Sequence, residues 1–264
     1  MGRGLLHRSL NIGGNVCVDK WKFYGITCAD HVMIDPISTA KIDELIEVLC
    51  LPEPANVLDI ACGKGELLVR LAARTPIVGT GVDLSPYFVA AARANVAARV
   101  QAPSHVEILC ADGRDYSPRE PLDLAMCVGA SWVFGGHAGT LAALRGYVRP
   151  GGLVLVGEPY WHHDPDPAYL AATGETPTSF LTHAGNVQAG IDAGLVPLYS
   201  VDASVDDWDR YEWLRVQAGE RYAYSHPEDP DGAEILQRTR ENRDIYLRWA
   251  RDTVGWALYL FFRP

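Results

Sequence analysis

A strand pattern that runs through a turn of small residues directly into a helix pattern constrains this chain more than any other feature. Asn56 to Ile60 is a short apolar run, Ala61 to Gly65 is the turn, and leucines then repeat at helical spacing from Leu67. Small residues let the backbone approach a ligand closely, and the first turn of the helix offers free N–H donors. The unit predicts an α/β fold with a ligand site at the end of the strand.

The same alternation of strand and helix continues along the chain. Apolar runs that are short and continuous, as expected of parallel strands covered on both faces, lie at 77–82, 106–110, 122–128 and 153–157. Helix patterns lie at 38–50, where Ser38 is a plausible N-cap, and at 86–99 and 140–148. This order predicts a doubly wound, parallel α/β sheet.

Two segments depart from the alternation. Residues 1–37 have no sustained period and are predicted as an irregular arm with a short helix. Beyond Glu158 we expect a loop or lid at 159–180, then a helix at 185–193 and a strand at 195–201. A helical lid insertion is predicted at 205–253, before an aromatic final strand at 256–262. All of this is compatible with one domain over 1–264.

Composition narrows the range of partners. A net charge of -10 without a Lys/Arg-rich run argues against nucleic acid, which needs a concentrated cationic face. Apolar runs stay well below the ~18–20 residues of a membrane helix. Six cysteines without metal-ligand spacing suggest reduced thiols and no metal site. We expect a cytoplasmic protein that acts on a small molecule away from the membrane, with its oligomeric state left open.

Three acidic residues follow three successive strands. Asp59 ends the first, Asp83 ends the second about twenty residues later, and Asp112 follows the third together with Gly113. A carboxylate at the second strand end can accept hydrogen bonds from both hydroxyls of a ribose, and one after the third can accept from the amine of adenine. At a single sheet edge, these residues outline a nucleoside site.

These motifs resemble those of the class I S-adenosylmethionine (SAM)-dependent methyltransferases. Asp59 to Gly65 resembles the first motif, Gly81 to Ser85 the second strand end, Cys110 to Gly113 the adenine-binding turn, and Pro150 to Gly152 the turn before the fifth strand. The resemblance implies SAM as cofactor and a seven-stranded sheet in the order 3-2-1-4-5-7-6 with the last strand antiparallel. Cys127 to Trp132 also resembles a largely uncharacterised bacterial subgroup, which implies no particular substrate.

The resemblance further implies which residues hold SAM. The first motif would surround the methionine part, with Ala61 at a position where the family usually has Gly. The next strand end would hold the ribose, the third turn the adenine, and the fourth strand end would face the sulfonium. The implied cofactor-binding residues are Asp59, Ala61, Gly63, Gly65, Asp83, Leu84, Asp112, Gly113, Cys127 and Gly129.

Catalysis and acceptor binding have weaker signals. Methyl transfer depends mostly on alignment of a nucleophile, with a general base as further help. Candidate catalytic residues are Glu158 at the fifth strand end, His31 in the arm, and Tyr160. Aromatic side chains can bind a flat or cationic acceptor, and the candidates for this are Tyr24, Trp132, Tyr160 and Trp161.

Alternatives remain open at this point. An NAD-dependent oxidoreductase uses the same sheet, but its GxGxxG fingerprint is missing because Leu68 follows Gly63 and Gly65 where the third glycine would lie. A SAM-binding protein without transfer activity is compatible with every motif. A methyltransferase for arsenic or another soft nucleophile would want paired thiols, for which Cys17 and Cys28 are the only candidates. The acceptor atom stays undecided among O, N, C and S.

Overall fold

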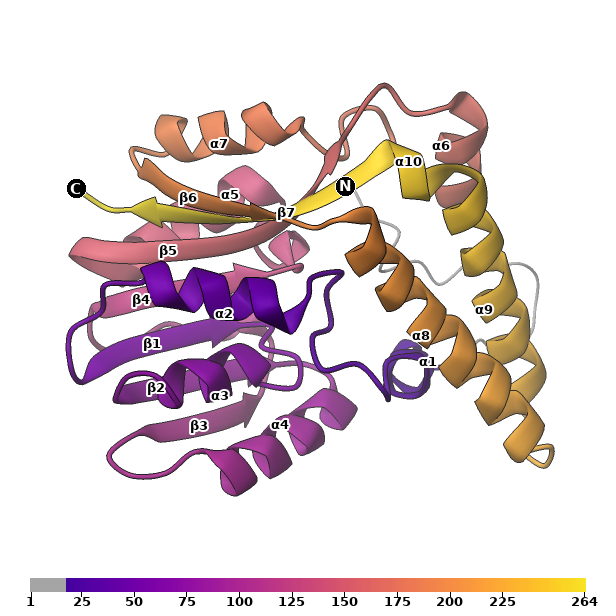
Figure 1. The fold of residues 1–264 in the computed structure, drawn as a ribbon, viewed down its shortest axis with the longest axis horizontal. Coiled ribbons are helices and arrows are strands. Elements are labelled where there is room, and N and C mark those ends of the chain that lie inside the picture. Colours follow the sequence, from indigo (N-terminus) through magenta and orange to yellow (C-terminus); the bar gives the residue numbers. More distant parts are fainter. Residues whose placement is uncertain (1–17) are drawn as a thin grey trace.

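The sheet has seven strands in the order β3-β2-β1-β4-β5-β7-β6, which confirms the predicted fold (Figure 1). The computed structural model describes residues 18–264, so Cys17 and the preceding part of the arm lie outside the described residues. The strands are β1 (Ala55–Ile60), β2 (Ile77–Asp83), β3 (His105–Cys110), β4 (Leu122–Val128), β5 (Val148–Trp161), β6 (Val196–Asp202) and β7 (Val254–Phe262). β1 to β5 pair in parallel, and β7 is antiparallel to both β5 and β6.

Helices cover both faces of the sheet. One core joins the strands to α2 (Thr39–Val48), α3 (Glu66–Ala72) and α4 (Pro86–Arg99), and a second joins them to α5 (His137–Tyr147) and α7 (His183–Asp192). The repeat predicted in α2 faces inward, because Ile42, Leu45 and Ile46 are all buried. Truncating a side chain such as Leu45 to alanine would cost about 2–5 kcal/mol. The two layers hold the strand ends in fixed positions.

The carboxyl ends of the parallel strands meet at one edge of the sheet. In the register, Asp59 of β1 lies between Gly81 of β2 and Met126 of β4. The strand order reverses between β1 and β4, and ligands of doubly wound sheets bind at such a switch point. The acidic strand ends are therefore brought to the position where a ligand is expected.

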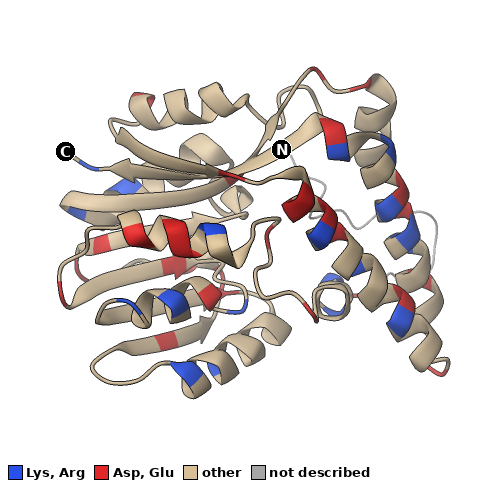
Figure 2. Cartoon of the chain, viewed as in Figure 1, with Lys and Arg blue, Asp and Glu red and all other residues tan. Residues whose placement is uncertain are grey.

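A helical cap lies beyond that edge (Figure 1). It consists of α8 (Val205–Ser225), α9 (Gly232–Ile245), the π-helical turn η3 (Tyr246–Ala250) and α10 (Arg251–Thr253), which connect β6 to β7. α6 (Pro167–Thr173) packs on it, because Tyr169 shares a buried cluster with Tyr246 and Ala250. Figure 2 shows acidic and basic residues interspersed along α8 and α9. The helical segment predicted at 205–253 lies here, while its role as a lid stays a prediction.

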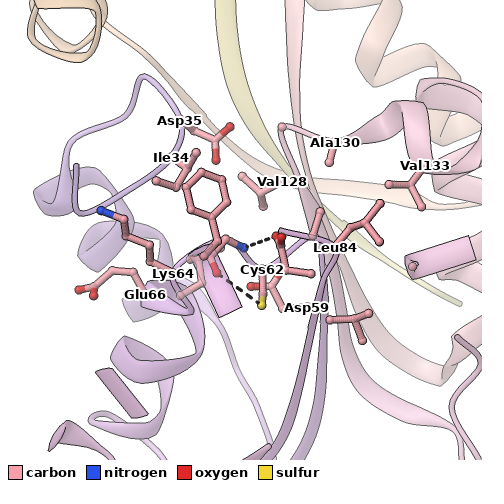
Figure 3. A pocket seen from close by; sticks show the side chains of 18 of the residues that line it. Ile34, Asp35, Asp59, Cys62, Lys64, Glu66, Leu84, Val128, Ala130 and Val133 are labelled. Atoms are coloured by element: carbon pink, nitrogen blue, oxygen red, sulfur yellow. Dashed lines mark hydrogen bonds between the residues drawn. The ribbon is translucent and has the colours of Figure 1, made fainter. Parts of the chain in front are cut away.

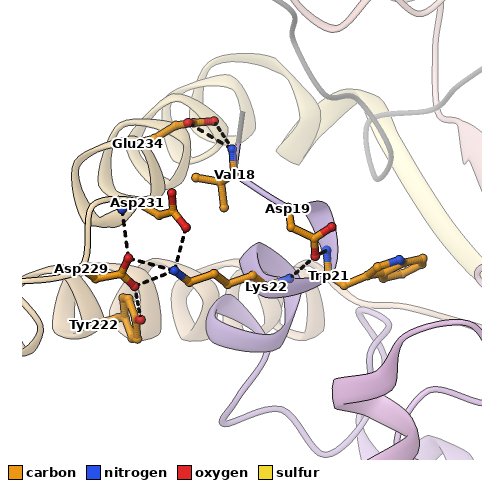
Figure 4. Close-up of polar contacts among 8 residues, drawn as sticks. All are labelled: Val18, Asp19, Trp21, Lys22, Tyr222, Asp229, Asp231 and Glu234. Carbon is orange, nitrogen blue, oxygen red and sulfur yellow. Dashed lines mark hydrogen bonds and ion pairs between the residues drawn. The ribbon is translucent and has the colours of Figure 1, made fainter. Parts of the chain in front are cut away.

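The arm is attached to the cap through helix α1 (Lys20–Thr27), the short helix expected in the arm (Figure 4). Asp19 caps α1 by accepting hydrogen bonds from the backbone N–H groups of its first turn. Lys22 forms ion pairs with Asp229 and Asp231, each at 2.7 Å, in the turn between α8 and α9. The described part of the arm thus packs as a third helix of the cap.

Several element boundaries differ from those predicted. β5 is longer than the predicted 153–157, because pairing with β7 continues it to Trp161. The turn at Pro150 to Gly152 lies inside β5 as an irregularity, where the register with β4 shifts. α6 occupies part of the region expected as a loop. Within residues 18–264, every helix is too short or too polar to cross a membrane. That the chain is one domain over 1–264 stays a prediction.

Candidate functional site

A pocket that is partly open to solvent lies where β1 and β4 diverge (Figure 3). Its floor is built by the ends of β1 to β4 and the turns after them, and its roof by the arm. We call Asp59, Ala61, Gly63, Asp83 and Gly129 the pocket floor, and Trp21, Ile34 and Asp35 the pocket roof. Further lining residues include Cys62, Lys64, Leu84, Asp112, Gly113, Val128, Ala130, Trp132 and Val133.

The turn after β1 is built from left-handed residues. Ala61 has φ 58°, Gly63 φ 54° and Gly65 φ 73°. Glycine adopts this region without penalty, whereas Ala61 is the only described residue other than glycine with positive φ. A Cβ on Gly63 would lie 3.2 Å from Cγ1 of Ile34 in the roof. Floor and roof therefore pack closely at this turn.

Asp83 holds the turns on either side of it. The backbone N–H of Gly63 donates to Oδ2 at 2.9 Å, and the N–H of Ser85 donates to Oδ1 at 2.8 Å. Burial raises the pKa of Asp83 to about 6, against the lowering effect of these hydrogen bonds. Each carboxylate oxygen has a further lone pair. The arrangement can accept two hydroxyl groups from the pocket.

Asp59 is a buried carboxylate with an unsatisfied atom. Its side chain is 2% exposed, it lines the pocket, and its Oδ1 has no hydrogen-bond partner in the described part of the chain. Burial, and then the nearby carboxylates of Asp35 and Asp83, raise its pKa well above the usual value. An unpaired buried charge is costly, so a cationic ligand group beside Asp59 would be strongly favoured.

The third acidic residue lies at the exposed end of the pocket. Arg114 donates to the Asp112 carboxylate from its guanidinium and from its backbone N–H, and these hydrogen bonds lower the pKa of Asp112. Gly113 is required by packing, since a Cβ there would lie 2.7 Å from Cγ2 of Ile60. Asp112 is thus ionised and partly neutralised by Arg114, and its contribution to binding is expected to be small.

The roof is fastened to the floor by one lysine. The Nζ of Lys64, in the turn after β1, donates to the backbone carbonyls of Cys28, Ala29 and His31, each at 2.8 Å. Figure 3 shows the Lys64 side chain extending away from the centre of the pocket. The ammonium group uses all three of its donors here. Lys64 therefore positions the arm and has no donor left for a ligand.

Two predicted cofactor residues do not line the pocket. Gly65 is the N-cap of α3 and packs against Ala92, whose methyl group lies 3.2 Å from the position that a Cβ on Gly65 would take. Cys127 is 1% exposed and belongs to the core on the α5 side of the sheet. Side chains alternate along a strand, so Val128 faces the pocket and Cys127 faces away. Both residues can act on the pocket only through the backbone.

The predicted base Glu158 lies behind the pocket. It is 6% exposed, and one carboxylate oxygen accepts a hydrogen bond from the Ser131 hydroxyl at 2.9 Å. The other oxygen lies 3.9 Å from Nδ1 of His137, and neither of these two atoms has a hydrogen-bond partner among residues 18–264. Burial raises the pKa of Glu158 to about 8. Glu158 supports the segment η2 (Ser131–Phe134), whose residues Trp132 and Val133 do line the pocket.

The other catalytic and acceptor candidates lie in packing contacts outside the pocket lining. The ring Nε2 of His31 is 2.9 Å from the carbonyl of Tyr211 in α8, and burial lowers the pKa of His31 to about 4. The Tyr160 hydroxyl donates to Asp202 at 2.7 Å. Trp161 packs in the cap core and Tyr24 against Phe23 of α1. Of the four predicted acceptor-binding aromatics, only Trp132 lines the pocket.

The roof residues are absent from the predicted site residues. Asp35 lines the pocket, and its Oδ1 lies only 1.9 Å from where a Cβ of Gly129 would stand, so it reaches directly over the end of β4. Trp21 enters from α1. The sequence places both in a segment without periodicity, and the Asp35-Pro36 pair alone resembles an ordinary turn. The signals that the sequence offers are the aromatic residues of the arm, Trp21 among them, and the resemblance of the arm with Asp35-Pro36 to the bacterial subgroup.

Comparison with known proteins agrees with this geometry. Residues 57–152 match the family described as "Methyltransferase domain". The uncharacterised protein YjhP of Escherichia coli K12 is 33% identical over 244 residues, which cover 92% of this chain and 98% of YjhP. Crystal structures of SAM-dependent methyltransferases in complex with S-adenosylhomocysteine (SAH) are similar over 92% of this chain and 98% of each relative. The protein from Thiobacillus denitrificans has a TM-score of 0.85 at 32% identity, and that from Geobacter sulfurreducens 0.84 at 29%.

Proposed function

Since this chain belongs to the SAM-dependent methyltransferases, within a YjhP-like bacterial subgroup, we propose that it transfers the methyl group of SAM to a small-molecule acceptor held between pocket floor and roof. Membership of this family decides against the NAD-dependent oxidoreductase. Family membership does not identify the acceptor or the residues that act on it, and these are what we propose here.

The pocket residues fit the proposed cofactor. The observation that carries the proposal is the buried Asp59 carboxylate, whose Oδ1 has no partner in the described chain although it lines the pocket. A cationic group satisfies it, and the methionine part of SAM carries an ammonium. Asp83, one strand away, offers carboxylate lone pairs to the two ribose hydroxyls. The two relatives whose structures contain SAH support SAM as the cofactor.

SAM, when bound, supplies a methyl group on a positively charged sulfur that a nucleophile can attack. The protein's part is to align the nucleophile with that methyl group and to exclude water. Lys64 keeps the roof over the pocket by holding three carbonyls of the arm. Lys22 joins the same arm to the cap, so closure of cap and roof would occur together.

The five described cysteines are free thiols, which suits the cytoplasm that we expect as the site of action.

Turnover distinguishes an enzyme from a protein that only binds SAM. Purified protein is incubated with SAM and pools of small amines, alcohols, thiols and carboxylates, and SAH is quantified by mass spectrometry. We expect SAH to form above the acceptor-free background with at least one pool, together with a product heavier by one CH₂. Tight SAH binding with background-level turnover in the presence of a total extract of bacterial metabolites would favour the non-catalytic alternative.

A further inference from the structure

Asp35 takes the place of a side chain at the end of β4. Gly129 has φ 68° and no Cβ, and the Asp35 carboxylate fills the space that this Cβ would need, with Oδ1 1.9 Å from its ideal position. The backbone on either side of Gly129 lines the pocket through Val128 and Ala130. In Figure 3, Asp35 lies in the upper part of the pocket and Asp59 in the lower part. The arm therefore delivers a carboxylate to the strand end that faces the reacting centre in the proposed function.

No group of the described protein satisfies this carboxylate. Asp35 has no hydrogen bond or ion pair to its side chain among residues 18–264, and desolvation alone raises its pKa to about 7. Asp59 is the second such carboxylate of the pocket, with a buried Oδ1 that has no partner among the described residues, and in the proposed function it meets the ammonium of SAM, which leaves Asp35 for the acceptor. Two carboxylates of this kind in one pocket point to a ligand that carries donors or positive charge at both places.

In the described part of the chain, the other charged residues that line the pocket do not neutralise Asp35 or Asp59. Glu66 is neutralised by Arg70 at 2.7 Å and by Arg99 at 2.6 Å. Asp112 is paired with Arg114. Lys64, the basic residue that lines the pocket, is fully engaged by the arm carbonyls. From residues 18–264, an anionic acceptor would thus meet carboxylates and no free cation, whereas an amine would meet Asp35 and the ring of Trp132.

We propose that Asp35 is the acceptor-facing carboxylate of this site and that the acceptor is a protic nucleophile of the amine class. The inference rests on the proposed methyl transfer. The amine nitrogen forms a bond to the methyl carbon while the bond from that carbon to sulfur breaks and leaves its electron pair on sulfur. The resulting ammonium gives one proton to Asp35, which later releases it to water. A carboxyl group with a pKa near neutral can both accept and release this proton.

The proposal can be tested without knowing the acceptor, through the SAM analogue sinefungin. Sinefungin carries a primary amine where SAM carries the transferred methyl group, so its amine probes the group facing that position. Sinefungin and SAH are titrated into the full-length protein, Asp35→Asn and Asp35→Ser by calorimetry. Asp30→Asn is the matched control, because Asp30 lies in the same arm but pairs with Arg221 of the cap. Thermal unfolding verifies that each variant is folded.

We expect the unaltered protein and Asp30→Asn to bind sinefungin at least about tenfold more tightly than SAH, as a charge-assisted pair would give. In both Asp35 variants this preference should fall to about one, while the affinity for SAH changes less than about threefold. A preference that survives in both variants, or an equal loss of both ligands, overturns the role of Asp35. Failure of the unaltered protein to bind SAH would instead contradict the proposed function.

Discussion

The pocket floor and the pocket roof line the same pocket, but different kinds of contact hold them in position. The floor consists of residues at strand ends and in short turns, whose positions follow from the sheet register, as with Asp59 between Gly81 and Met126. The roof is an arm segment fixed by contacts distant in sequence, through Lys64 to the floor and Lys22 to the cap. In the proposed function, the floor holds the cofactor and the roof selects the acceptor.

Removal of the Asp83 carboxylate is the strongest test of the floor. Asp83→Ala deletes the carboxylate that we propose as the acceptor for two ribose hydroxyls and should weaken SAH binding by about 1.5–3 kcal/mol, measured by calorimetry. Asp115→Ala is the control, because Asp115 is exposed and outside the pocket lining. A folded Asp83→Ala variant with unchanged SAH affinity would remove the ribose assignment.

Glu158 tests whether the buried network behind the floor is separate from the floor itself. Its pKa is raised in the folded protein to about 8, so its contribution to stability is present below its ordinary pKa near 4.5 and is lost as the pH rises toward 8. Between pH 5 and pH 7, Glu158→Gln should therefore gain about 2.5 kcal/mol in free energy of unfolding relative to the unaltered protein.

Urea unfolding at the two pH values measures this difference, and Glu107→Gln, at an exposed position of β3, is the control. SAH affinity should stay within about threefold in Glu158→Gln, since the side chain does not line the pocket. Turnover of the same variant tests the sequence-based prediction that Glu158 is a catalytic residue, because a general base at this position would make Glu158→Gln slower than the unaltered protein. Equal pH dependence of both proteins would show that Glu158 is not held protonated.

Lys64 tests the attachment of the roof. Lys64→Met keeps the length of the side chain and removes three hydrogen bonds to the arm. We expect SAH binding to weaken by about 1–1.5 kcal/mol and the arm to become more sensitive to limited proteolysis. Lys41→Met is the control, since Lys41 joins α2 to the cap through Asp207 and does not line the pocket. Equal proteolysis of both variants would mean that Lys64 does not hold the roof.

Asp112 should give the smallest effect. Its carboxylate is already paired with Arg114 at the exposed end of the pocket. Asp112→Asn keeps an oxygen acceptor for an adenine amine, so the expected loss of SAH affinity is about 0.5 kcal/mol. If calorimetry finds a loss as large as that of Asp83→Ala, the two carboxylates contribute equally to SAH affinity. The ion pair with Arg114 would then not reduce the contribution of Asp112.

The position of the floor residues at the sheet edge is well predicted because the information it needs is local, while their role in cofactor binding stays a prediction. The βα alternation fixes which residues lie at the carboxyl edge, and Gly63 and Asp83 need only the right spacing to meet there. The prediction is wrong for side-chain direction where a strand boundary is wrong. The pattern places Glu158 at the end of β5, but the strand continues to Trp161, and the Glu158 side chain points toward Ser131 of η2 and His137 of α5.

The roof could not be predicted in the same way. Asp35 matters because the arm returns over Gly129, and that path depends on contacts with Lys64 and with Tyr211 of α8, whose hydroxyl donates to the Ile34 carbonyl at 3.4 Å. No periodicity or spacing in the arm indicates such long-range contacts. A glycine at a strand end, such as Gly129, becomes informative only when the residue that packs on it, here Asp35, is known.

Hydrogen exchange measured by mass spectrometry, with and without SAH, tests most directly whether floor and roof enclose one ligand. The account predicts protection of peptides that contain residues 59–65 and 83–85, and equally of the arm peptide around 31–37, with no change in β6 or α7. Protection of the floor peptides alone, with the arm exchanging as in the free protein, would contradict a site closed from both sides and with it the assignment of Asp35.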